Sequence, residues 1–163
     1  MRNLFLLIFI SILSAQVRLL VPEEYPTIQE GIDAAAAGDT VFVATGTYSP
    51  ETGENFPIIM ISNINLIGED EEMTILDAQQ TGTVVTMDDC ENNTISDLTI
   101  TGGTGINGGG MDLQSSNPIL THVTIANNTA TTGGGMYLDF SDPILTHVTI
   151  SNNTAEIYGA GMR

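Results

Sequence analysis

Side chains that could recognise a sugar recur at a fixed interval in the second half of the chain. Three pairs are separated by this interval: Asp112 and Tyr137, Gln114 and Asp139, and Ser115 and Phe140. An aromatic ring can stack on the apolar face of a sugar, and a carboxylate accepts hydrogen bonds from its hydroxyl groups. We therefore take Asp112, Tyr137, Asp139 and Phe140 as candidate ligand-binding residues. The alternative is an ordinary solvated face that contains one tyrosine.

Two histidines also share a repeat position. His122 and His147 are separated by the same interval, and the same phasing places Asp97 and Asn63 in their column. Stacked at the strand spacing of about 4.8 Å, such side chains could bind a metal ion. We favour the alternative, a hydrogen-bonded ladder that satisfies the backbone groups of a turn. No catalytic residue, metal ligand or cofactor is therefore predicted, although the acidic composition leaves Ca²⁺ binding open.

The triplet Asn-Asn-Thr occurs at 92–94, 127–129 and 152–154. It matches the pattern of an N-glycosylation acceptor. Its fixed place in the repeat favours turn residues instead, because Asn tolerates the left-handed backbone conformation that turns require.

Charge narrows the range of partners. The chain has 20 Asp plus Glu, three Arg and no Lys, and its formal net charge is −17. Nucleic acid is excluded as a partner, because neutralising phosphates requires Lys and Arg. Cys90 is the only cysteine, so the chain forms no intramolecular disulfide. An extracellular polysaccharide remains the partner that fits the candidate residues.

Residues 1–15, MRNLFLLIFISILSA, are typical of a secretory signal peptide. Arg2 precedes an apolar run from Leu4 to Leu13, and small and polar residues follow. The run is shorter than the roughly 20 residues that span a bilayer, and no later segment is apolar enough to form a transmembrane helix. We therefore expect a protein that is secreted or displayed at the cell surface. A buried N-terminal strand is the alternative.

Two 25-residue segments, 108–132 and 133–157, are identical at 18 positions. Self-similarity at this period indicates a solenoid, in which each unit buries its apolar side against the next. Short runs of Ile, Val and Thr alternate with Gly, Asn, Asp and Pro, which are strand and turn signals. The sequence therefore predicts an all-β fold, a right-handed parallel β-helix over 40–163. Each coil would hold three short strands, in the last coil at 136–138, 144–145 and 148–150. No C-terminal cap is visible, so we expect the coils to be incomplete at that end.

When the earlier coils are aligned with this repeat, three columns of apolar residues at equivalent positions are predicted to point into the core. They consist of Val41, Ile64, Leu98, Val123 and Val148; of Val43, Leu66, Ile100, Ile125 and Ile150; and of Ile61, Ile95, Leu120 and Leu145. An outward row of Thr99, Thr124 and Thr149 also suggests an ice-binding face. We discount that interpretation, because one threonine per coil makes only a narrow row.

Residues 16–39 form the predicted N-terminal cap. Thr27-Ile-Gln-Glu30 is a capping box that starts a helix. Ile28 and Ile32 fall on one face of that helix, and Gly38 can end it. The helix would cover the open end of the first coil, whose first strand is predicted at 40–43.

Three stretches resemble the pectin lyase-like superfamily of right-handed parallel β-helices. They are VPEEYPTIQEGIDAAAAGDTVFVATGTY (21–48), NINLIGEDEEMTILDA (63–78) and the GGGM-x-L…P-I-L-T-x-V-T-I…NNT units. The resemblance covers about 22–163. It implies a glycan groove on the outer face of the first strand of each coil, where Asp112 and Tyr137 are expected.

The residues that carry catalysis in such relatives do not match here. The similar lyases use a Lys or Arg base, with Asp residues holding Ca²⁺, but this chain has no Lys, and Arg18 and Arg163 lie near its ends. The similar hydrolases and esterases use paired Asp residues, whereas Asp88 and Asp89 are adjacent and would point to opposite faces of a strand. We therefore expect a non-catalytic β-helix that binds glycans or acts as a structural or adhesive scaffold. The alternative is a polysaccharide lyase, hydrolase or esterase whose catalytic coils lie beyond Arg163.

Overall fold

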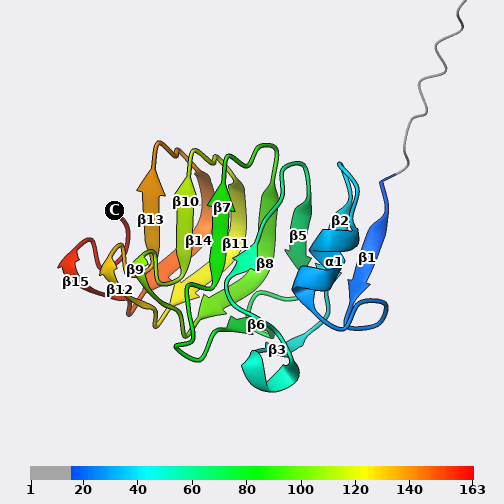
Figure 1. The fold of residues 1–163 in the computed structure, drawn as a ribbon, viewed down its shortest axis with the longest axis horizontal. Helices are drawn as coiled ribbons and strands as arrows, with labels where there is room; N and C mark the ends of the chain where they lie inside the picture. Colours follow the sequence, from blue (N-terminus) through cyan, green and yellow to red (C-terminus); the bar gives the residue numbers. More distant parts are fainter. Residues whose placement is uncertain (1–15) are drawn as a thin grey trace, which may run out of the picture.

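The computed structural model describes residues 16–163; the predicted signal peptide, 1–15, lies outside the described residues. The chain winds as a right-handed parallel β-helix of about six turns (Figure 1). This architecture confirms the predicted fold class. No helix within residues 16–163 has the length and apolar character needed to cross a bilayer.

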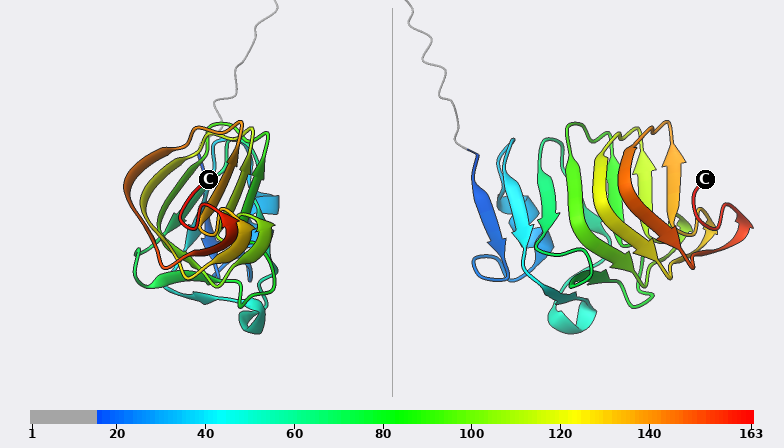
Figure 2. Two further views of the ribbon diagram at one scale, coloured as in Figure 1. Left: turned by 90° about the vertical axis from the view of Figure 1, so that its left-hand side faces the viewer. Right: turned by 180° about the vertical axis from the view of Figure 1, so that it is seen from behind.

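Three parallel sheets form the sides of the β-helix (Figure 2). The longest contains six strands in succession, β1 (Arg18–Val21), β2 (Thr40–Val43), β5 (Asn65–Gly68), β8 (Thr94–Thr101), β11 (Ile119–Ala126) and β14 (Ile144–Ser151), with β3 (Gly46–Tyr48) and β6 (Thr74–Asp77) beside this path. The second contains β4 (Ile58–Ile59), β7 (Val85–Asp88), β10 (Met111–Gln114) and β13 (Met136–Asp139). The third contains β9 (Thr104–Asn107), β12 (Thr129–Thr132) and β15 (Thr154–Tyr158).

The last coil has three strands, as predicted, and all three predicted segments lie in strands, but two of them were wrongly taken as separate strands. The segments at 144–145 and 148–150 belong to one strand, β14, because the positive φ of His147 (52°) bends the backbone without ending the strand. The third strand is β15, which the sequence analysis missed. Its pairing partner β12 has the sequence Thr-Ala-Thr-Thr, which lacks the large apolar residues that mark a strand.

Corners of the coils repeat one backbone conformation from turn to turn. Positive φ angles recur in the columns Asp97, His122 and His147 (51–56°), Asn127 and Asn152 (53–59°), and Asp89, Ser115 and Phe140 (48–50°). Asn, Asp and His adopt this left-handed region more readily than other non-glycine residues. The interpretation of Asn92, Asn127 and Asn152 as turn residues is therefore confirmed, since all three have φ between 53° and 59°.

The predicted register of the inward columns is confirmed for the last three coils, although Leu145 in the last coil is 38% exposed. Leu120 pairs with Ile95 and Leu145, Val123 with Leu98 and Val148, and Ile125 with Ile100 and Ile150. Leu98, Val123 and Ile125 are fully buried. Like residues therefore stack over like residues in the core, where each contributes roughly 1.5–3 kcal/mol.

For the earlier coils the predicted pairing was wrong, although Val41, Val43, Ile64 and Leu66 are buried as predicted. Val41 pairs with Leu66 rather than Ile64, Leu66 pairs with Ile95 rather than Ile100, and Ile61 is 45% exposed. The chain leaves the sheet after Gly68 and returns as β6, so the second half of β8 pairs with β6 instead of β5. The apolar spacing of 61–66 imitates that of 95–100, and spacing alone could not reveal the detour.

The N-terminal cap contains an additional strand. The first strand is β1, which pairs with β2, so the prediction that 40–43 comes first was wrong. The predicted cap helix exists as α1 (Ile28–Ala34), packs against β1, β2 and β4, and buries Ile28 and Ile32. It ends at Ala34 rather than at Gly38, whose φ of 97° belongs to the turn before β2.

The start of α1 is held from a distance by Glu54. Thr27 Oγ1 accepts a hydrogen bond from the Glu30 amide (3.2 Å), which is one of the two bonds of the predicted capping box. Glu54, which is 3% exposed, accepts from the Ile28 amide (2.7 Å) and the Gln29 amide (3.4 Å). Burial raises the pKa of the Glu54 carboxyl above its ordinary value of 4.5, although these backbone donors oppose the shift.

We expect Glu54→Gln to change how stability depends on pH. Because the folded-state pKa of Glu54 is raised, the folded protein binds this proton more tightly than the unfolded chain does. The free energy of unfolding therefore falls as pH rises from about 4.5 through the folded-state pKa. Urea unfolding at several pH values should show the stability of the native protein falling relative to Glu54→Gln over that window. Glu51→Gln, at an exposed position nearby, controls for the loss of one charge. If the unfolding free energy of the native protein stayed constant or rose relative to that of Glu54→Gln as pH rises through this window, the raised pKa of Glu54 would be contradicted.

Candidate functional site

The candidate residues lie on the outer face of the sheet formed by β4, β7, β10 and β13. Asp112 pairs with Tyr137, and Gln114 pairs with Asp139, in an unbroken parallel register. Ser115 and Phe140 follow at the corner, where both have a positive φ. The structure therefore brings Asp112, Tyr137, Asp139 and Phe140 together in adjoining rows. We call the surface made by these residues with Thr86, Asp88 and Gln114 the β10–β13 face.

Two members of this face, Thr86 and Asp88, were not predicted from the sequence. Thr86 pairs with Asp112, and Asp88 pairs with Gln114, so a third coil extends both rows. The sequence feature that could have revealed them is the alternation of apolar and polar residues in Val85-Thr-Met-Asp88, which is the same as in Met111-Asp-Leu-Gln114 of the next coil. Asp88 is exposed on the row that also holds Asp139, and Asp89 lies at the corner beyond it.

Asp112 is the most unusual group on the face. Its Oδ1 atom is buried without a hydrogen-bond partner, while Oδ2 accepts a long bond from Gln114 Nε2 (3.4 Å). Burial raises the pKa of the Asp112 carboxyl, and the nearby carboxylates of Asp139 and Asp88 raise it further. The carboxyl therefore has unused capacity for hydrogen bonds.

Two aromatic rings belong to the same face. Tyr137 is half-buried in the row of Asp112, and Phe140 is 90% exposed at the corner after Asp139. The backbone of Phe140 has φ 49°, a region that bulky residues rarely occupy. A phenyl ring is thus held in solvent by a corner whose other members are Asp89 and Ser115.

The two near-identical repeats differ at this face more than at any other surface. Seven positions separate 108–132 from 133–157, and three of them are the pairs Asp112/Tyr137, Gln114/Asp139 and Ser115/Phe140 on this face and at its corner. The other four are Asn117/Asp142 in the next loop, Ala126/Ser151 at the ends of β11 and β14, and Thr131/Glu156 and Thr132/Ile157 in β12 and β15. The outward side chains of β11 and β14 are also accessible, yet their sequences are the same from Ile119 to Ile125 and from Ile144 to Ile150. Solvent exposure alone therefore does not explain where the repeats diverge.

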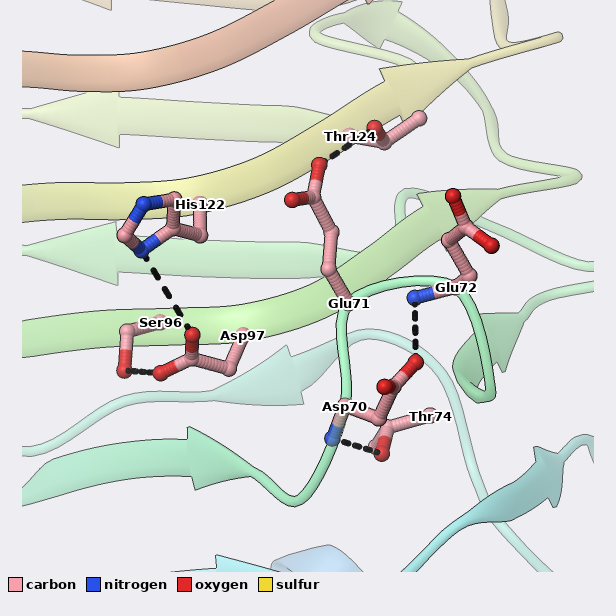
Figure 3. A network of polar contacts seen from close by, with 8 residues as sticks. All are labelled: Asp70, Glu71, Glu72, Thr74, Ser96, Asp97, His122 and Thr124. Atoms are coloured by element: carbon pink, nitrogen blue, oxygen red, sulfur yellow. Dashed lines mark hydrogen bonds and ion pairs between the residues drawn. The ribbon is translucent and has the colours of Figure 1, made fainter.

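The two histidines share one column, as predicted, on the opposite side of the coil. Their rings are stacked with centroids 4.8 Å apart and planes 8° from parallel. His122 Nδ1 lies 3.6 Å from Asp97 Oδ1 (Figure 3). The prediction for Asn63 was wrong, because its Oδ1 accepts from Asn92 Nδ2 (3.0 Å) in another column. Nitrogen lone pairs lie in the ring planes, so parallel rings do not converge on one ion. Within residues 16–163, no three His, Cys, Asp or Glu side chains are placed to share a metal ion.

The threonine row next to the histidines is covered. Thr99 Oγ1 donates to the Glu71 carbonyl at 2.8 Å. Thr124 Oγ1 donates to the Glu71 carboxylate, also at 2.8 Å (Figure 3). Glu71 belongs to the segment that leaves the sheet after Gly68. This agrees with discounting the ice-binding interpretation, since the segment engages two of the three threonines.

Stacked parallel coils, a short cap helix and one variable outer face define a repeat protein of the parallel β-helix class. The chain belongs to the family DUF1565, described as a protein of unknown function, whose model matches residues 22–161. Neither a curated protein nor a solved structure matches the chain.

Proposed function

We propose that this protein is an exported, non-catalytic parallel β-helix that binds a polysaccharide through its β10–β13 face. The observation that carries the proposal is the group of repeat differences on that face and at its corner, while the outward strands β11 and β14 stay identical from Ile119 to Ile125 and from Ile144 to Ile150. Repeat proteins present binding surfaces on one side of the stack and vary the residues there.

The chemistry of the face suits a glycan. Tyr137 and Phe140 supply rings that can stack on a sugar, and Asp112 and Asp139 supply acceptors for its hydroxyl groups. Asp112 Oδ2 holds only the long bond from Gln114 and would accept a second one from a bound hydroxyl. A neutral polymer fits better than an acidic one, because the face holds several carboxylates and the chain carries a net charge of −17.

Export and distant kinship to the pectin lyase-like superfamily belong to the same proposal. The apolar run after Arg2 supports export. The three stretches that resemble the superfamily supply the kinship, and a parallel β-helix is compatible with it. In that superfamily the outer face of the equivalent strands holds the glycan, which agrees with the location of Tyr137.

Tyr137→Ala and Asp112→Asn should each weaken glycan binding. We expect roughly a three- to tenfold loss for Tyr137→Ala, since stacking on an aromatic ring contributes about 0.5–1.5 kcal/mol. The measurement is calorimetric titration with neutral and acidic oligosaccharides, with and without Ca²⁺, while products are monitored. Tyr158→Ala is the matched control, because Tyr158 is exposed on β15, in another sheet. Absence of binding to every glycan would refute the proposal, as would equal losses in Tyr137→Ala and Tyr158→Ala.

A polysaccharide-degrading enzyme is the second candidate, and Asp112 is the observation that favours it. A carboxyl with a raised pKa beside the carboxylates of Asp88 and Asp139 resembles the acid and base pairs of glycoside hydrolysis. Product release in the same titration would identify this function. Loss of that release in Asp112→Asn would place the chemistry on this face rather than in other coils.

A further inference from the structure

A cavity of about 400 Å³ opens at the N-terminal end of the β-helix. Arg18 and Leu20 of β1, Phe42 of β2, and Glu23 and Glu69 of the following loops contribute to its lining. The β10–β13 face belongs to another sheet, so the cavity is a separate site. Pockets of this size are typical of small-molecule sites.

Arg18 is positioned by an aromatic ring rather than by an acid. Its Cζ atom lies 3.3 Å from the centroid of the Phe42 ring, which is a cation–π contact. Among residues 16–163, no carboxylate lies within ion-pair distance of Arg18, although acids are abundant. Stacking uses the flat face of the guanidinium, so the N–H donors at its edge stay free for a planar carboxylate.

The rest of the cavity is acidic and apolar. Glu69 is fixed in place, because its Oε2 accepts a hydrogen bond from the Thr45 amide (2.9 Å). Glu23 is exposed on the loop after β1. Leu20 and Phe42 are half-buried neighbours across β1 and β2 and form an apolar floor. The cavity thus offers one bidentate cationic donor, two carboxylate acceptors and a surface for a small apolar body.

We propose that this cavity binds a small molecule that has one carboxylate together with hydroxyl or ammonium donors. Arg18 would take the carboxylate in a bidentate contact, and Glu23 and Glu69 would accept from the donors. Molecules with several negative charges are disfavoured, because the cavity holds one cation and two carboxylates. Sugar acids and free amino acids both have this chemistry.

The test is a titration of the purified, isotope-labelled protein followed by NMR, with glucuronate, alanine and glucose as probes. We expect saturable shifts of amides in 18–23 and 42–45 with glucuronate, alanine or both, and none with glucose. Binding of glucuronate alone would identify a hydroxyl-bearing acid, and binding of alanine alone would identify a zwitterion. Glucose binding as tight as glucuronate, or no saturable shift with any probe, would overturn the proposal.

Variants separate recognition from net charge. Arg18→Gln should weaken binding at least tenfold, because it removes the charged bidentate donor. Arg18→Lys keeps the charge and should also weaken binding, since it lacks the planar fork. Arg163→Gln removes the same charge from the last coil and should leave affinity unchanged. The amide spectrum of each variant also reports whether the fold is intact. Equal affinity in Arg18→Gln and Arg163→Gln, with the fold intact, would contradict the role of Arg18.

Discussion

Gly68→Ala is expected to destabilise the protein by about 3 kcal/mol or more. A Cβ atom at position 68 would overlap the backbone oxygen of Asp97 and would lie 3.1 Å from Leu98 Cβ. Neither neighbour can move easily, because β8 pairs with β5 and β6 on one side and with β11 on the other. Gly68 is the point where β5 ends and the chain leaves the sheet, so the close approach is part of the detour.

Urea unfolding of Gly68→Ala measures this effect, and Gly82→Ala is the matched control. At position 82 the nearest atom to a new Cβ is the Phe56 oxygen at 3.5 Å, which is an ordinary contact. We expect this variant to remain within about 1 kcal/mol of the native protein. If both variants unfolded at the same urea concentration, the approach of position 68 to Asp97 could not be as close as the structure has it.

Asn128→Ala is expected to cost about 2–5 kcal/mol, because truncation would leave two backbone groups without partners inside the coil and each such group costs about 1–3 kcal/mol. Asn128 is fully buried; its Oδ1 accepts from the Gly103 amide (2.8 Å), and its Nδ2 donates to the Ile100 carbonyl (3.1 Å). Asn128 also contacts Asn153 of the next coil, so the loss would loosen the stacking of two turns.

The adjacent residue provides a sharp control for Asn128. Asn127 is exposed and has φ 59°, a conformation that glycine adopts freely, so Asn127→Gly should change stability by less than about 1 kcal/mol. The measurement is the midpoint of thermal unfolding of each variant, compared with that of the native protein. A larger loss in Asn127→Gly than in Asn128→Ala would show that the corner conformation matters more than the buried amide.

Internal repetition determines how much could be predicted. The register of β10 with β13 and of β11 with β14 followed from the near-identity of 108–132 and 133–157, and it placed Asp112 opposite Tyr137 correctly. Where repetition weakens, the prediction relied on apolar spacing, which the detour after Gly68 made misleading. Asp88 was missed for the same reason, since its coil shares only the alternation of apolar residues with later ones.

The cavity at Arg18 lay beyond sequence reasoning for a different reason. Its residues come from β1, β2 and the loops that follow β1 and β5, and no motif connects them. The strand β1 is itself short, and its sequence Arg-Leu-Leu-Val has no counterpart in the repeat. Residues from such dissimilar segments come together only in the folded structure, so no feature of the sequence indicated that they line one cavity.

The unbroken register between the last coils has an evolutionary consequence. Because 133–157 lies on 108–132 with matching columns, the two sides of one repeat are complementary to each other. A tandem duplication of one repeat would therefore insert a complete turn, with its corners and core already fitted, and would displace nothing on either side. Lineages could lengthen or shorten the rod in whole turns, while each added turn brings a fresh copy of the outer strand on which new side chains can be selected.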